Sequence, residues 1–205
     1  MDASGKELAN KIACAELIQA WGVYRDQGKW QELRGTFKPD GLISISWFRG
    51  PFEQFVDRCK ASFEAGHTWS RHHLSAPFIK IEKDRATAET SVVIRVRQKF
   101  GGVDVDLTSC SRFLDRVERH GSAWLIAERA AIYERDRLDP VEPSSEFDAL
   151  FAEDTSHYPE QYRYMAFRIA HAEGRALAPV VYRDGGPETA DLYARFSAWL
   201  AGGTA

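Results

Sequence analysis

"RATAETSVVIRVRQKFGGVDVDLTSCSRFLDRVERHGSAWLIAERAAIYER", residues 85–135, contains three strand-like runs separated by two short connections. Apolar and polar residues alternate along 85–99, 103–118 and 122–135, as they do in strands that bury one face. The connections FGG and RHGS carry the glycines that tight turns between antiparallel strands need. Residues 70–82 have the same pattern and join this group through EKDR. The four runs predict an antiparallel meander.

The residues before the meander have helical periodicity instead. Ser4 and Glu7 have the spacing of a capping box, which opens a run of apolar residues at helical intervals. Pro51 is typical of the first turn of a further helix. The elements expected here are a helix from about residue 4 to Gly28, a short helix at 29–37, a KPDG turn at 38–41, a strand at 42–48 and a helix at 51–65.

Helices that precede a meander indicate an α+β domain, in which a strongly curved, mostly antiparallel sheet wraps around the N-terminal helices. DPVEPSSE at 139–146 breaks the composition, so we place this domain at residues 1–138. Residues 139–205 are expected to form a helical C-terminal extension, with helices at 147–154, 158–174 and 187–203. This tail is too apolar to be left in water. We expect it to pack on the outer face of the sheet or on a partner subunit, or alternatively to form a lid over a pocket.

The bulk composition narrows the class of protein. The chain has 205 residues, 44% hydrophobic and 28% charged, with a formal charge of −3, and its mean hydropathy of −0.41 is that of a soluble globular protein. Charges of both signs are interspersed without a basic stripe, which argues against a nucleic-acid partner. No secretory signal and no apolar run of about 18 residues is present, so we expect a cytoplasmic protein that does not enter a membrane. The cysteines at 14, 59 and 110 are too far apart for a disulfide framework or a CxxC site.

Two adjacent histidines stand in GHTWSRHHLSA, residues 66–76. Successive side chains of a strand leave opposite faces of the sheet, so His72 and His73 cannot both line one pocket. Together with His67 they lack the spacing of an HExxH zinc motif, and no carboxylate cluster is near. G-x-S-x-G, P-loop and G-x-G-x-x-G motifs are absent as well. We therefore expect no metal site and no cofactor.

A wider pattern carries a family resemblance. Trp21 is followed by Asp26, by Gly28-x-Trp30, by an FxPDG turn and later by the strand that bears the two histidines. This order resembles the superfamily of nuclear transport factor 2, scytalone dehydratase and the SnoaL-type cyclases, over roughly residues 8–137. The resemblance implies a cone-shaped fold with a deep pocket, catalysis without a cofactor, and a homo-oligomer, either a dimer or a trimer.

The resemblance also implies roles for individual residues. The aspartate that the dehydratase carries on a helix falls on Asp26, and its first catalytic histidine falls on His73. In that scheme Asp26 holds the imidazole and His73 transfers the proton. A second catalytic histidine of the dehydratase falls near Arg97, which can bind an oxyanion but cannot act as an acid at neutral pH. The residues expected to bind substrate are Trp21, Tyr24, Trp47, His72, Arg97, Cys110 and Arg129.

Each of these residues also has a purely structural interpretation. Asp26 alone resembles a solvated helix end, Arg97 a solvated strand residue, and aromatic stripes are most often core.

Our leading hypothesis is a cofactor-free lyase that acts on a small hydroxylated aromatic compound and releases water or a small carbon fragment such as formaldehyde. The alternatives are an isomerase or polyketide cyclase that uses the same pair, and a module that only binds a ligand or a partner chain. A further alternative is that the dimer itself is the function.

Overall fold

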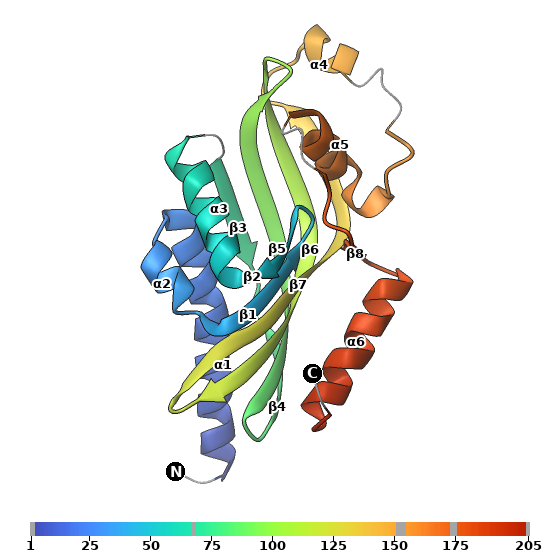
Figure 1. The fold of residues 1–205 in the computed structure, drawn as a ribbon. Coiled ribbons are helices and arrows are strands. Elements are labelled where there is room, and N and C mark those ends of the chain that lie inside the picture. Colours follow the sequence, from blue (N-terminus) through green and yellow to red (C-terminus); the bar gives the residue numbers. More distant parts are fainter. Residues whose placement is uncertain (1–2, 67–68, 151–154, 173–175, 204–205) are drawn as a thin grey trace.

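A computed structural model of the protein describes residues 3–66, 69–150, 155–172 and 176–203 (Figure 1). The helices are α1 (Ala3–Gln27), α2 (Trp30–Arg34), α3 (Phe52–Glu64), α4 (Ser145–Leu150), α5 (Arg163–Ala172) and α6 (Pro187–Leu200), with one 3-10 turn, η1 (Glu160–Tyr162). The strands are β1 (Phe37–Ile45), β2 (Phe48–Pro51), β3 (Trp69–Leu74), β4 (Phe78–Glu82), β5 (Arg85–Phe100), β6 (Val103–His120), β7 (Ala123–Pro140) and β8 (Tyr182–Arg183).

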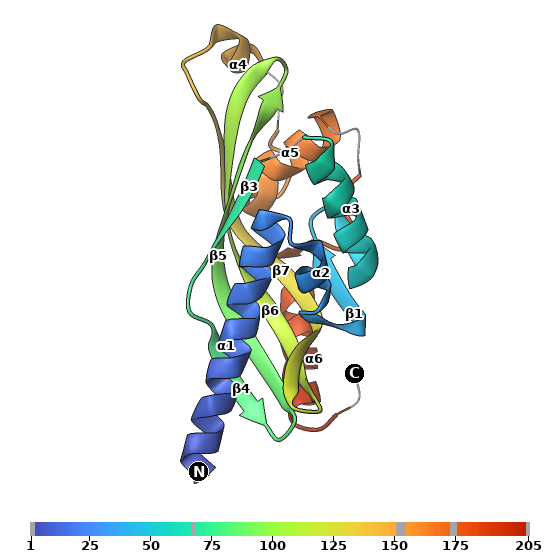
Figure 2. The same ribbon diagram turned by 90° about the vertical axis from the view of Figure 1, so that its left-hand side faces the viewer.

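The described strands form one mixed, mostly antiparallel sheet in the order β2-β1-β7-β6-β5-β3, with β4 added on β5 and β8 on β7. The long strands β5, β6 and β7 pair antiparallel in sequence, which confirms the last three strands of the predicted meander. Helices α1 to α3 lie on one side of the sheet and α6 on the other (Figure 1), and the sheet curves around α1 (Figure 2). The α+β cone expected from the sequence is therefore confirmed. The parallel pairing of β1 and β8 with β7 was not predicted.

The prediction of one strand over residues 70–82 is wrong. The chain forms two strands, β3 and β4, which both pair antiparallel with β5. The break falls at residues 75–77 and ends with Pro77, which has no N–H to donate to a ladder. This break lets the edge of the sheet bend across α1, which contacts both strands.

The predicted turn at 38–41 is a bulge inside β1. Phe37 pairs with Ile126 and Leu42 with Glu128, so β1 advances five residues where β7 advances two. Gly41 permits the bulge, because a Cβ atom there would lie 2.8 Å from the Phe37 ring. The Phe37 ring in turn stacks on Phe52 at 3.6 Å between centroids. Phe37 begins β1, so the preceding helix ends at Arg34, three residues before the predicted end at residue 37.

The C-terminal tail packs on both faces of the sheet. On the outer face, Leu192 and Phe196 of α6 pack against apolar residues of the meander, Leu114, Ala130 and Ile132. On the inner face, Met165 and Phe167 of α5 join the main core cluster together with Trp21 and Phe55. The tail thus forms the predicted outer cover and also part of the interior. Residues 151–154 and 173–174 of the predicted tail helices lie outside the described residues, and the domain division at 138 stays a prediction.

A buried ion pair lies at the centre of the cone. Asp115 of β6 and Arg129 of β7 stand directly opposite each other, and both side chains are 0% exposed. The guanidinium donates two hydrogen bonds to the carboxylate, at 2.7 and 2.8 Å. It also lies 4.3 Å from the Trp21 ring centroid and 4.4 Å from that of Phe113. Removing one partner would leave the other charge buried without compensation.

We predict that Asp115→Ala lowers the free energy of unfolding by about 3–5 kcal/mol, because it leaves the buried Arg129 guanidinium without a carboxylate partner. Urea unfolding followed by circular dichroism measures this change. Asp106→Ala is the matched control, since it breaks a two-hydrogen-bond pair with Arg97 on the exposed face, and we expect little measurable change there. Equal losses in the two variants would contradict the prediction.

Candidate active site

Asp26 and His72 form a hydrogen-bonded pair between α1 and β3. Asp26 lies one residue before the end of α1, and His72 lies in the middle of β3. The Asp26 carboxylate accepts the His72 backbone N–H through Oδ2, and Oδ1 lies 2.6 Å from His72 Nδ1. The two side chains are only 11% and 10% exposed. One carboxylate therefore fixes both the backbone and the ring of the histidine.

This contact sets the protonation state of the imidazole. Because a carboxylate only accepts hydrogen bonds, Nδ1 carries the proton and Nε2 keeps its lone pair. Burial lowers the pKa of His72, and the charges of Arg25 and Arg129 lower it further, while the hydrogen bond and charge of Asp26 oppose this shift. The net lowering leaves a neutral imidazole at neutral pH. His72 is therefore suited to accept a proton at Nε2.

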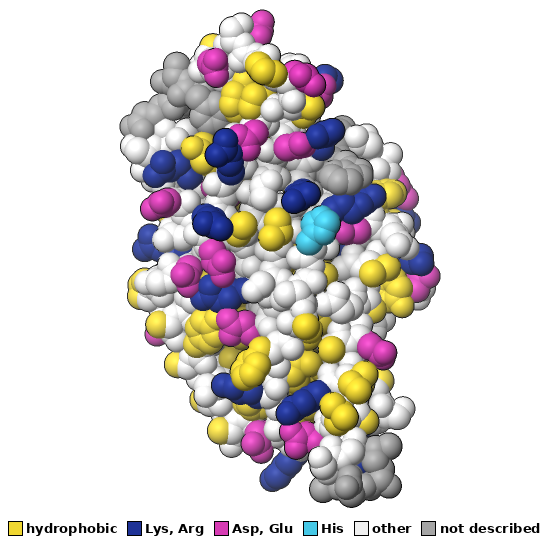
Figure 3. Space-filling model, turned by 180° about the vertical axis from the view of Figure 1, so that it is seen from behind, with side chains coloured by type: hydrophobic (Ala, Val, Ile, Leu, Met, Phe, Trp, Pro, Cys, Tyr) yellow, Lys and Arg dark blue, Asp and Glu magenta, His cyan; other side chains and the backbone are white. Residues whose placement is uncertain are grey.

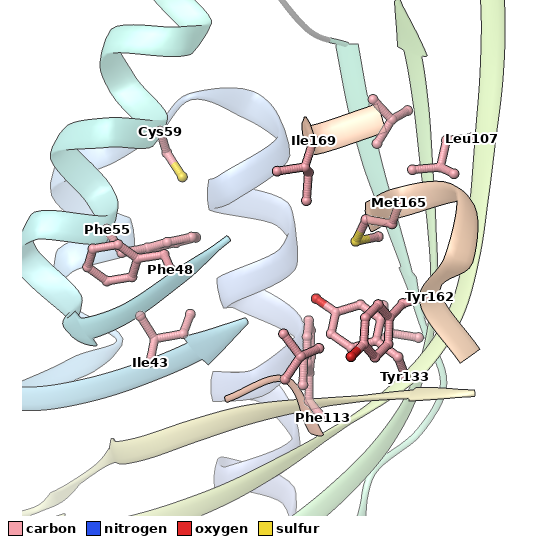
Figure 4. Close-up of a cluster of buried hydrophobic side chains, with 14 of the residues drawn as sticks. Ile43, Phe48, Phe55, Cys59, Leu107, Phe113, Tyr133, Tyr162, Met165 and Ile169 are labelled. Atoms are coloured by element: carbon pink, nitrogen blue, oxygen red, sulfur yellow. The ribbon is translucent and has the colours of Figure 1, made fainter. Parts of the chain in front are cut away.

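His72 lines a cavity of about 130 Å³ inside the cone. Figure 4 shows Phe55 and Cys59 of α3 on one side of this space, with Met165 of α5 and Tyr133 of β7 on the other. The Trp21 ring contacts His72 edge to face, with centroids 5.4 Å apart. The lining residues are Trp21, Arg25, Ile45, Ser46, Trp47, Phe55, Arg58, Cys59, Ser62, Ser70, His72, Ile94, Val96, Phe113, Tyr133, Met165 and Arg168.

Tyr133 supplies a hydroxyl to the cavity wall. Its oxygen accepts the backbone N–H of Ser46 at 3.0 Å. Burial raises the pKa of Tyr133, so its hydroxyl keeps the proton at neutral pH. Since the oxygen accepts from Ser46, the phenolic O–H is left to donate. The wall thus offers a neutral hydrogen-bond donor as well as the basic Nε2 atom of His72.

Helix α5 is fixed to the cone by Asp136 of β7. This carboxylate accepts the backbone N–H groups of Tyr164 and Met165, at 3.2 and 2.6 Å, in the first turn of the helix. Met165 and Arg168 then line the cavity, and Arg168 Nη1 donates to the Gln98 side chain at 2.7 Å. A segment of the C-terminal tail therefore completes the wall.

The expectation that His73 contacts Asp26 is wrong. His73 is exposed, on the opposite face of β3 from His72. It pairs with Val93, which in turn pairs with Cys110. Because residues paired across strands point to the same face, Cys110 also lies outside the cavity. The expectation that Cys110 lines the pocket is wrong for the same reason.

Three further expected substrate contacts lie away from the cavity. Arg97 is exposed and pairs with Asp106 at 2.6 and 2.8 Å. The residues of β5 that line the cavity are Ile94 and Val96. Arg129 lies behind the rings of Trp21 and Phe113, in the buried ion pair. Tyr24 is half-buried and does not line the cavity.

The structure brings together Trp21, Trp47 and His72 as expected from the sequence, and adds residues that the sequence analysis missed. Tyr133 was detectable, since it shares the alternating phase of Arg129 along 122–135, which places both on the inner face. Apart from their positions in predicted helices, nothing in the sequence indicated that Arg25 and Arg58 would line the cavity. Nothing in the sequence indicated that α5 would contribute to the wall.

Comparison with known proteins identifies the family. The family model of the SnoaL-like domain matches residues 6–130, more than half of the chain. The chain belongs to the SnoaL-like family. A PEP2-like protein of Fusarium vanettenii is 29% identical over 159 residues, which cover 77% of this chain and 68% of that protein.

Two solved structures share the fold of this SnoaL-like protein at low sequence identity. A candidate scytalone dehydratase of Novosphingobium aromaticivorans is 15% identical with a TM-score of 0.56, covering 69% of this chain and 93% of that one. A type 2 hexachlorocyclohexane dehydrochlorinase, LinA, is 12% identical with a TM-score of 0.57, covering 69% of this chain and 95% of that one. These likenesses establish the nuclear transport factor 2-like fold, which is related to that of dehydratases and dehydrochlorinases.

The remaining sequence-based site predictions concern cysteines, metals and membranes. Cys14 and Cys59 are buried and Cys110 is half-buried, and within the described residues none of the three forms a disulfide. Burial raises the pKa of Cys14 to about 12, which makes it an inert core residue. Within the described ranges, no three His, Cys, Asp or Glu side chains group closely enough to hold a metal ion. None of the described helices has the length and apolar character to span a membrane.

The lowered pKa of His72 predicts a pH-dependent stability. In the unfolded chain a histidine binds a proton below about pH 6.5, whereas the folded protein keeps His72 neutral to lower pH. The free energy of unfolding should therefore be highest above that pH and fall as the pH decreases between the two pKa values. Urea titrations at a series of pH values measure the slope. His72→Gln should flatten it, and an unchanged slope in this variant would contradict the assignment.

Proposed function

We propose that the protein is a cofactor-free lyase that acts on a small hydroxylated aromatic compound, with Asp26 and His72 as its acid/base pair. The observation that carries the proposal is the carboxylate-bound imidazole on the wall of an aromatic cavity, where burial lowers the pKa of the ring. The fold relationship to dehydratases and dehydrochlorinases supports the same reaction class. This pair differs from the one expected from the sequence only in its histidine, which is His72 and not His73.

In this mechanism His72 serves as base and then as acid. Nε2 takes a proton from a carbon atom, the electrons of the C–H bond form a C=C bond, and the neighbouring C–O bond breaks. The imidazolium, stabilised by the Asp26 carboxylate behind it, then gives the proton to the departing hydroxide, which leaves as water. When a hydroxymethyl group is lost instead, Nε2 takes the proton of its O–H group and the C–C bond breaks to release formaldehyde. The electron pair left on carbon is then protonated by the imidazolium.

The cavity also limits the substrate. A volume of about 130 Å³ compares with the roughly 150 Å³ of an apolar cavity that holds one benzene ring. Trp47 and Trp21 both stack with Phe55, at 5.7 and 6.5 Å between centroids, so flat apolar walls are present for such a ring. The Tyr133 hydroxyl would donate to an oxygen that gains negative charge during the reaction. We therefore propose a single-ring substrate with at least one oxygen substituent.

We predict that Asp26→Asn and His72→Gln each reduce turnover by about 10²–10⁴-fold, the contribution of general acid/base catalysis. A panel of hydroxylated single-ring aromatics is incubated with each variant, and water loss or formaldehyde release is followed by mass spectrometry and a formaldehyde assay. Thermal unfolding checks that each variant folds. His73→Gln is the matched control, because it alters the adjacent exposed histidine and should keep full activity.

The products separate the proposal from its alternatives. An isomerase would return a product of unchanged mass, and a cyclase would require a longer, flexible substrate. A ligand-binding module would bind members of the panel without converting them. Full activity of both the Asp26 and the His72 variants would end the acid/base assignment.

A further inference from the structure

The cavity lining has an uneven charge. Among its described residues are three arginines, Arg25 from α1, Arg58 from α3 and Arg168 from α5, and no aspartate or glutamate. Arg58 is exposed and Arg25 is half-buried, which places these two at the opening rather than in the interior. The opening of an otherwise aromatic cavity is therefore cationic.

Arg25 and Arg58 contact aromatic rings instead of carboxylates. The Arg25 guanidinium lies 5.9 Å from the centroid of Trp30, and that of Arg58 lies 4.9 Å from the centroid of Phe48. In the described part of the chain neither guanidinium forms an ion pair. The nearest acidic side chains of α3, at positions 53 and 57, bind Arg34 instead.

Several other arginines of the protein are neutralised by carboxylates. Arg129 pairs with Asp115 in the core, and Arg112 on the outer face contacts three carboxylates, those of Glu89, Glu134 and Asp184. The side of the molecule that faces away from the viewer in Figure 1 carries basic and acidic side chains side by side (Figure 3). Arg25 and Arg58 differ from these arginines, because within the described residues they line one cavity and neither forms an ion pair. A pair of this kind is suited to an anionic ligand.

We propose that Arg25 and Arg58 bind an anionic oxygen group of the aromatic substrate, a carboxylate or a phenolate, at the opening of the cavity. This inference deepens the proposed function and rests on it for the position of the ring beside His72. A guanidinium presents a planar fork of N–H donors that matches the two oxygens of a carboxylate and also binds a single phenolate oxygen. Holding the anion at the opening would orient the ring, with its other end toward His72 and Tyr133.

Isothermal titration calorimetry with small probes tests the proposal without any need for turnover. Benzoate is compared with benzamide, which has nearly the same shape without the charge, and 4-nitrophenol is compared above and below its own pKa. The two comparisons distinguish a carboxylate from a phenolate. The variants are Arg25→Gln and Arg58→Gln, with Lys60→Gln as the matched control. Lys60→Gln removes one positive charge from α3, the helix that carries Arg58, but Lys60 does not line the cavity.

We expect at least one anion to bind about tenfold more tightly than its neutral counterpart, as one charge-assisted hydrogen bond would provide. Both arginine variants should lose this preference and Lys60→Gln should keep it. The proposal is overturned if neither anion binds, if charged and neutral probes bind equally, or if the arginine variants keep the preference. A His72 variant that loses turnover but still binds benzoate would support the arginine proposal. Binding and turnover are measured separately, so the arginine proposal and the acid/base proposal can fail independently.

Discussion

The double contact between the Asp26 carboxylate and His72 is the constraint on which the candidate site depends. Strand β3 lies at the end of the sheet order, so only one of its edges is paired, with β5. The backbone N–H of His72 is bound by Asp26, which ties the free edge of the strand to the end of α1. Open sheet edges are otherwise sites of unwanted pairing. The same carboxylate that covers this edge also fixes the tautomer of the ring, so fold and chemistry share one interaction.

The charges around His72 act in opposite directions. Asp26 favours the protonated ring, whereas burial and the guanidiniums of Arg25 and Arg129 favour the neutral ring, and the second group prevails. Arg129 exerts its influence from behind the floor of the cavity, since the rings of Trp21 and Phe113 cover it. The Asp115–Arg129 pair therefore packs beneath these rings, and the charge of its Arg129 also helps to keep the His72 imidazole neutral.

The helices and strands could be predicted well from the sequence. Which strand residues point into the cone could be predicted less well. Periodicity identified α1, α3 and the meander, because each has a long amphipathic pattern with clear ends. The stretch SRHHLS carries polar residues on both faces, so its alternation showed that one histidine faces inward without showing which. Cys110 was misplaced for the same reason, and the register shift of β6 after Cys110 adds to it. Arg97 was assigned from the family resemblance, although its alternation with Val96 indicates the outer face. The bulge in β1 and the docking of α5 depend on contacts distant in sequence, with Phe52 and Asp136, which no local pattern reveals.

The position of α5 means that the cavity is built from two parts of the chain. The family match ends at residue 130, yet Met165 and Arg168 belong to the chamber that His72 faces. The proposed acid/base pair thus lies within the part of the chain that the family model matches, whereas some of the residues that line the cavity lie beyond it. Substitutions at Met165 or Arg168 therefore reshape the space beside His72 without replacing either partner of the Asp26–His72 contact.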